Sequence, residues 1–170
     1  MKKYVFGWVL MPVVLLALSM GCGKKNPDDP QSLTAPGSAT MKLTQGGQVV
    51  VELKTLKAVS IGGGNYAVDI SSADEKNALS LSIEGETAGT YPFISATQSL
   101  TKGKANFTLL SYALPAAYAG TAGVLNPESG EIVVKIATKS RISGTFNGSG
   151  KNLKDGKTYT LEGTFDAPVF

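Results

Sequence analysis

From Met41 onward, apolar residues recur at every second position in several short runs, and this period of two constrains the fold more than any other feature. Successive side chains of a β-strand point to opposite faces, so such runs predict strands with one buried and one solvated face. No long run with helical spacing follows residue 40. We therefore predict an all-β domain of about eight to ten largely antiparallel strands, either a β-sandwich or a partly open barrel.

Four runs show the alternation most clearly. The residues expected to face inward are Val49, Val51 and Leu53, then Tyr66, Val68 and Ile70, then Leu79, Leu81 and Ile83, and finally Ile132, Val134 and Ile136. Segments 62–65 and 74–77 are rich in glycine, asparagine and charged residues, which is typical of turns. Residues 54–60 fit a short helix or a bulged strand, and we favour the strand because both neighbouring segments are strands.

The C-terminal part predicts a hairpin. The segments RISGTF and TLEGTF both end in Gly-Thr-Phe and lie on either side of Asp155 and Gly156. Asp-Gly favours a two-residue hairpin loop, which would place Phe146 opposite Phe165. A cross-strand aromatic pair of this kind helps to fix the strand register.

The N-terminus has the pattern of a secretory signal. Lys2 and Lys3 precede an almost wholly apolar segment, Tyr4 to Leu18, and small residues follow. The apolar segment has about 15 residues, fewer than the roughly 20 that a membrane-spanning helix needs. We therefore expect a signal helix that is cleaved from the mature chain.

The Gly21-Cys22 pair after this segment resembles the lipobox of bacterial lipoproteins. The resemblance implies that residues 1–21 are the signal peptide, that Cys22 is the lipidation site, and that fatty-acyl chains such as palmitate attach the protein to a membrane. Gly23, where an aspartate would favour the inner membrane, points by the same resemblance to the outer membrane, with the face undefined. The alternative is cleavage after Ser19, which would leave Cys22 as a free thiol.

Residues 22–40 are expected to form a flexible, disordered tether, because they are rich in Pro, Ser, Gly and Asp and lack apolar periodicity. At roughly 3.3 Å per residue the extended tether would be about 60 Å long. Residues 41–170 have the size of one domain with its own core.

Composition argues against several kinds of chemistry. The chain has one cysteine and no histidine, so it lacks Ser-His and Cys-His pairs, histidine zinc sites and a disulfide. Glu84 and Glu86 flank Gly85, and we interpret them as solvated charges rather than as a catalytic pair. We expect no enzymatic activity, no metal and no cofactor. The lysines and arginines are scattered, which gives no support for nucleic-acid binding.

The C-terminal half also carries a family resemblance. GTYPF at 89–93, SGEIVVKI, RISGTF and TLEGTF resemble the pattern of small lipid-anchored bacterial β proteins that are grouped as a domain of unknown function. The resemblance covers about half of the chain, residues 85–170. It implies an all-β fold and a lipoprotein address, and it implies no activity and no catalytic residues.

Two tyrosines are candidate contacts for a ligand or partner. Tyr118 lies in the middle of segment 113–129, a long stretch without strand periodicity. Such loops are often functional, although this one also fits a loop packed over a sheet end. Tyr91, in the GTYPF segment, is a second candidate contact or else a core anchor.

Two functions from different classes fit these features. One is a non-enzymatic binding module on a tether, which captures a glycan, a peptide or a surface partner. The alternative is a structural or assembly lipoprotein of the periplasmic face that contacts another envelope protein. Trp8 lies in the expected signal, and the absence of tryptophan elsewhere slightly disfavours glycan stacking. The sequence does not decide between the two.

Overall fold

The computed structural model describes residues 35–170 except 74–76, 96 and 112–123. These residues form strands and connecting turns, and no helix among them is long and apolar enough to cross a membrane. The strands are β1 (Ser38–Gln45), β2 (Gln48–Ile61), β3 (Tyr66–Ser71), β4 (Asn77–Ile83), β5 (Gly89–Pro92), β6 (Ala105–Ser111), β7 (Val124–Ala137), β8 (Arg141–Asn152) and β9 (Thr158–Pro168). The all-β prediction is confirmed.

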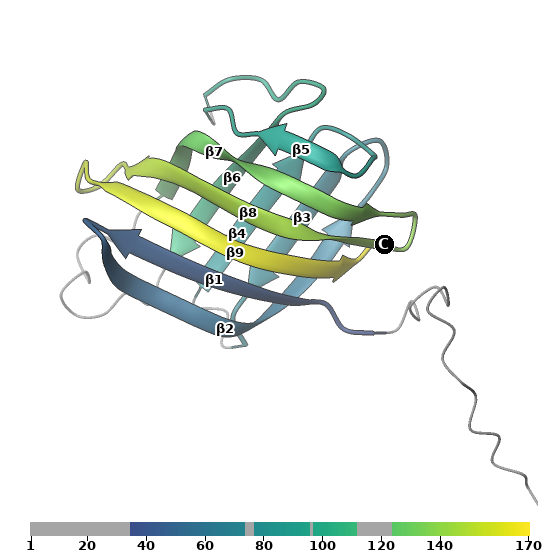
Figure 1. The fold of residues 1–170 in the computed structure, drawn as a ribbon, viewed down its shortest axis with the longest axis horizontal. Helices are drawn as coiled ribbons and strands as arrows, with labels where there is room; N and C mark the ends of the chain where they lie inside the picture. The colour runs from purple at the N-terminus through teal and green to yellow at the C-terminus, as the bar shows by residue number, and fades with distance from the viewer. Residues whose placement is uncertain (1–34, 74–76, 96, 112–123) are drawn as a thin grey trace, which may run out of the picture. The chain divides into compact units, whose positions relative to one another are not determined.

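The strands form one antiparallel sheet in the order β5-β7-β6-β4-β3-β2-β1-β9-β8. Because β7 also pairs with β8, the sheet curls round until its two sides meet, as Figure 1 shows. The architecture is therefore a nearly closed barrel. Of the two predicted forms, the partly open barrel is the one observed.

The barrel is least complete where β6 meets β7. Among the residues that the structure describes, only Leu109 and Leu110 of β6 pair with β7, and farther along β7 the short strand β5 takes the place of β6. Phe93, directly after β5, packs edge to face against Phe107 of β6 with 4.9 Å between the ring centroids. Phe93 thus fills the seam with an aromatic ring where the backbone ladder is short.

Large side chains fill the interior of the barrel. Those that are fully buried are Tyr159, Phe107, Phe165, Ile70, Leu79, Leu81, Ile83, Leu109, Ile132, Ile142, Leu161 and Val68. A ring of about eight strands has an interior just wide enough for side chains to fill. The cavities described below lie at one end of the barrel and on its outer face, outside this packed core.

Most of the predicted inward positions are confirmed. The inward residues of β3 and β4 are buried as their alternation predicts. Residues 54–60 belong to β2 and are strand, as we favoured. Ala39 pairs with Leu56 whereas Met41 pairs with Leu53, so β2 contains one extra residue here. Because of this bulge, the buried side chains of β2 change from an odd-numbered position, Val51, to even-numbered positions that begin at Leu56.

Two predicted inward residues are wrong, and bulges explain both. Val49 is 53% exposed, because an extra residue in β2 at Val50 reverses the alternation near the turn. Ile136 is 48% exposed, because β7 has an extra residue at Lys135 opposite β8.

The predicted β8–β9 hairpin forms, but its register differs from the prediction by two residues. Phe146 lies opposite Gly163 and Phe165 lies opposite Gly144, so the predicted Phe146–Phe165 pair is wrong. Each ring instead packs near the glycine of the neighbouring strand. A Cβ at Gly163 would lie 2.5 Å from the Phe146 ring, and one at Gly144 would lie 3.0 Å from the Phe165 ring.

The loop chemistry explains this difference in register. The Asp155 carboxylate accepts hydrogen bonds from the Lys157 N–H at 2.9 Å and from the Tyr159 hydroxyl at 2.8 Å. Gly156 adopts a φ of 68° and donates its N–H to the Asn152 carbonyl. Asp155 and Gly156 therefore lie inside a longer loop, between the end of β8 and the start of β9.

The chain enters the barrel earlier than expected. β1 begins at Ser38, whereas the tether was expected to extend to residue 40. Gly37, just before β1, lies against the Ala58 carbonyl, and a Cβ there would lie 2.9 Å from Cδ of Pro168. The chain thus enters between β2 and β9, at the end of the barrel where β9 ends (Figure 1).

The close packing at Gly163 gives a test of the register. We expect Gly163→Ala to lower the free energy of unfolding by about 1–3 kcal/mol, because the new Cβ meets the Phe146 ring and the Thr40 carbonyl. Thr160→Ala, at an exposed position of the same strand, should change it by less than about 0.5 kcal/mol. Urea denaturation of the two variants measures the difference, and equal stabilities would contradict the register.

Candidate functional site

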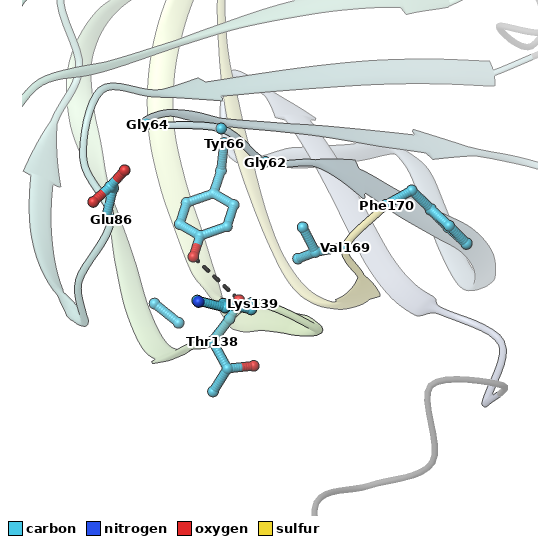
Figure 2. A pocket seen from close by; sticks show the side chains of 10 residues that line it. Gly62, Gly64, Tyr66, Glu86, Thr138, Lys139, Val169 and Phe170 are labelled. Atoms are coloured by element: carbon cyan, nitrogen blue, oxygen red, sulfur yellow. Dashed lines mark hydrogen bonds between the residues drawn. The ribbon is translucent and has the colours of Figure 1, made fainter.

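One end of the barrel carries an open cavity of about 540 Å³, which Figure 2 shows in close-up. It lies among the β2–β3 turn, the segment after β4, the β7–β8 turn and the last two residues. The lining residues are Gly62, Gly63, Gly64, Tyr66, Glu86, Ala137, Thr138, Lys139, Val169 and Phe170. We call this end of the barrel the cavity end. Its volume lies in the range typical of small-molecule sites.

Tyr66 is the aromatic centre of the cavity. Its ring is buried, and its hydroxyl donates a hydrogen bond to the Thr138 carbonyl at 3.3 Å. Figure 2 shows the ring extending into the space between Glu86 and Val169. Burial raises the pKa of Tyr66, and the negative charge of Glu86 raises this pKa further. The phenol therefore stays neutral at physiological pH and offers a hydrogen-bonding group to the cavity.

Lys139 projects from the tight turn between β7 and β8. Thr138 and Arg141 close the turn: the Thr138 N–H donates to the Arg141 carbonyl, and the Arg141 N–H donates to the Thr138 hydroxyl, both at 2.9 Å. The Arg141 guanidinium binds both carboxylate oxygens of Asp166 at 2.7 and 2.8 Å. This bond raises the pKa of Arg141. The backbone that carries Lys139 is therefore held from two sides.

The last two residues form the opposite wall. β1 begins only at Ser38, so the chain after β9 lies directly beside β2. The Phe170 N–H donates to the Ser60 carbonyl and the Val169 N–H to the Ser140 carbonyl, both at 3.0 Å. The two bonds connect this wall to β2 on one side and to the β7–β8 turn on the other.

Glu86 lies on a loop that Tyr91 supports. The buried Tyr91 hydroxyl donates to the Thr87 carbonyl at 2.7 Å. A Cβ at Gly85 would lie 2.5 Å from the Tyr91 ring, so only glycine lets the loop pack so closely. The Glu86 carboxylate reaches toward the β2–β3 turn, with Oε1 lying 3.6 Å from where a Cβ of Gly64 would be.

The cavity carries two charged side chains, Glu86 and Lys139. Among the residues that the structure describes, neither of them forms an ion pair. One negative and one positive group thus line the same cavity, on loops held by backbone hydrogen bonds. The arrangement suits a small ligand that carries both an ammonium group and an anionic group.

The structure locates only one of the three residues that the sequence singled out. Tyr91 is buried, supports the Glu86 loop and lines a smaller neighbouring cavity of about 380 Å³. Cys22 and Tyr118 lie outside the described residues.

Glu86 and Lys139 were not predicted from the sequence to be site residues. Both occupy turns, where charged residues are usually solvated, and Glu86 was interpreted in that way. The sequence held one signal that these turns lie at the same end of the barrel. Successive strands of an antiparallel sheet alternate in direction, so every second turn falls at the same end. How close those turns lie depends on the order of the strands in the sheet, and the sequence pattern does not indicate that order.

A second cavity, of about 650 Å³, lies on the outer face of β2, β1, β9 and β8. Its charges are already paired, with Lys42 Nζ 2.8 Å from Glu162 and Lys54 Nζ 3.5 Å from Glu52. The hydrogen bond to Glu162 raises the pKa of Lys42. No metal-ligating cluster of three or more side chains occurs in the described part of the chain. The cavity end is the stronger candidate because its charged groups remain available.

Comparisons with known proteins do not identify the chain: no protein-family model, curated protein or solved structure gives a significant match. The resemblance to lipid-anchored β proteins of unknown function stays a prediction.

The pKa of Tyr66 tests the geometry of the cavity. Its proton stabilises the fold below the unfolded-state pKa of about 10, and this stability is lost as the pH rises through the higher folded-state pKa. We expect Glu86→Gln to lower the pKa of Tyr66, because it removes a nearby negative charge. NMR titration of ¹³Cζ-labelled tyrosine measures the midpoint. Glu162→Gln, on the outer face, is the control, and equal midpoints in the two variants would contradict the placement of Glu86.

Proposed function

We propose that this protein is a non-enzymatic lipoprotein of the bacterial cell envelope, and that its barrel is a binding module on a tether. The observation that carries the binding role is the cavity at one end of the barrel, where Glu86 and Lys139 have no ion-pair partner among the described residues. The barrel interior is packed with side chains, so the cavity end is the best-formed place for a ligand.

The rigidity of the surrounding loops supports a binding role. The hydrogen bonds at Thr138, Ser140 and Thr87 hold the backbone around the cavity before any ligand arrives. A preorganised site loses less conformational entropy on binding. The non-enzymatic part of the proposal rests on composition, because the chain contains no histidine and its one cysteine is the expected lipidation site.

The proposed location in the cell envelope rests on the N-terminal sequence. In this proposal Cys22 carries the acyl chains and Gly23 directs the protein to the outer membrane. We expect Cys22→Ser to move the protein from the membrane fraction to the aqueous fraction. Mass spectrometry of the N-terminal peptide of the native protein should find a lipidated Cys22. An unmodified N-terminus at residue 20 or 22 would contradict the lipoprotein assignment.

Photo-crosslinking in intact cells tests the binding module. A benzophenone amino acid at Phe170 reports on the cavity end, and one at Leu153 reports on the opposite end, where another large apolar side chain is exposed. We expect adducts at position 170 that Glu86→Gln reduces, and few at position 153. Equal labelling at both positions would contradict a binding role for the cavity end. A dominant protein adduct at position 170 would favour the assembly role over capture of a small ligand.

A further inference from the structure

The rim of the cavity is apolar as well as charged. Phe170 is 80% exposed and Ile61 is 61% exposed, and the Phe170 N–H donates to the carbonyl of Ser60, the residue before Ile61. Val59, on the same outer face of β2, is also exposed. Three large apolar side chains are therefore presented to solvent beside a cavity that contains one negative and one positive group.

The chain enters the barrel at the end that carries this rim. A membrane anchor on the N-terminal segment would therefore hold the rim close to the membrane. β1 starts at Ser38, which pairs with Asp166 near the end of β9, so the chain enters the barrel at the cavity end. Between Cys22 and Gly37 lie 14 residues, so the two positions are at most about 50 Å apart. A chain anchored at Cys22 would thus keep the cavity end within reach of the lipid surface, and often nearer to it than the opposite end.

A phospholipid surface matches the two kinds of group together. Its headgroups bear charge, and its interface accepts aromatic and aliphatic side chains that lie beside them. An ethanolamine headgroup carries a primary ammonium and a phosphate separated by two carbons. The ammonium donates hydrogen bonds to a carboxylate, and the phosphate accepts them from a lysine.

We propose that the cavity end docks on the bilayer by binding the headgroup of an ethanolamine phospholipid. Glu86 takes the ammonium, Lys139 takes the phosphate, Tyr66 lines the same cavity, and Phe170 and Ile61 enter the interface. This inference rests on the proposed binding function and assigns its ligand class.

The same charges disfavour other lipids. A glycerol headgroup offers no cation, so Glu86 would face an anionic surface without a partner. A choline headgroup has no N–H, and its quaternary ammonium is best bound by several aromatic faces, whereas this cavity offers Tyr66 and the exposed Phe170. We therefore expect selectivity for ethanolamine over choline and over glycerol.

Fluorescence of a single tryptophan in the lipidated mature protein tests the proposal. In the proposed mature protein the signal that contains Trp8 has been removed, so Phe170→Trp alone reports on the cavity end and Leu153→Trp alone reports on the opposite end. The lipidated protein is reconstituted into three kinds of vesicle in which every lipid has brominated acyl chains. One kind is phosphatidylcholine alone, and in the other two half of it is replaced by phosphatidylethanolamine or by phosphatidylglycerol. The anchor binds all three, so differences in quenching report on docking of the barrel.

We expect quenching of the Phe170→Trp protein to be at least about threefold stronger in the ethanolamine vesicles than in the other two, with little quenching of Leu153→Trp in any. Glu86→Gln and Lys139→Gln should each abolish the difference. Glu128→Gln and Lys151→Gln, which remove exposed charges toward the opposite end, should leave it unchanged. Circular dichroism checks that every variant is folded.

Two results would overturn the proposal. Equal quenching in all three vesicles would mean apolar contact without headgroup recognition, and quenching at neither position would mean that the barrel does not dock. Either result would leave the binding module open to a different ligand, because the crosslinking experiment detects partners of any class. Loss of crosslinking at position 170 would instead remove the binding function itself.

Discussion

The barrel depends on glycines that make room for aromatic rings on its inner face. Phe146 packs near Gly163, Phe165 near Gly144, and Phe93 near Gly148, so that each ring lies against a neighbouring strand that has no side chain at that point. A ring of about eight strands has a narrow interior, and three aromatic rings fit there only if their neighbours give up volume. Because β8 and β9 hold two of these pairs, closure of the sheet and filling of the core depend on the same residues.

The order of the strands also creates the candidate site. Glu86 and Lys139 are far apart in the sequence, and they line one cavity because β5, which follows the Glu86 loop, pairs with β7, and the turn after β7 carries Lys139. The supporting residues are equally distant from one another: Tyr91 holds the Glu86 loop, and Thr138 holds the hairpin of Lys139. Local sequence indicates the turns and their charges, but the distance between two turns depends on the order of the strands in the sheet.

The parts of the fold that sequence predicted are those decided by one strand alone. Alternation in β3 and β4 identified Tyr66, Val68 and Leu79 as buried, because burial of one face imposes a period of two. It failed at Val49 and Ile136, because a bulge is a response to the partner strand. It failed again in the β8–β9 register, where the bonds from Asp155 to Tyr159 and Lys157 override the usual Asp-Gly loop. Of the candidate residues, Tyr91 is buried, which fits the core-anchor alternative, and its support of Glu86 was visible only in three dimensions.

A tether and a weak headgroup site would complement each other. Recognition by one carboxylate, one ammonium and one phenol is too small an interface to hold a free protein on a membrane. An acyl anchor at Cys22 changes that requirement, because a short flexible linker converts docking into an intramolecular step at an effective concentration in the millimolar range. A site of about millimolar affinity would then be occupied roughly half of the time. The barrel would alternate between a docked state, with the cavity end covered, and a free state within the reach of the tether. The composition of the lipid would set the balance between the two.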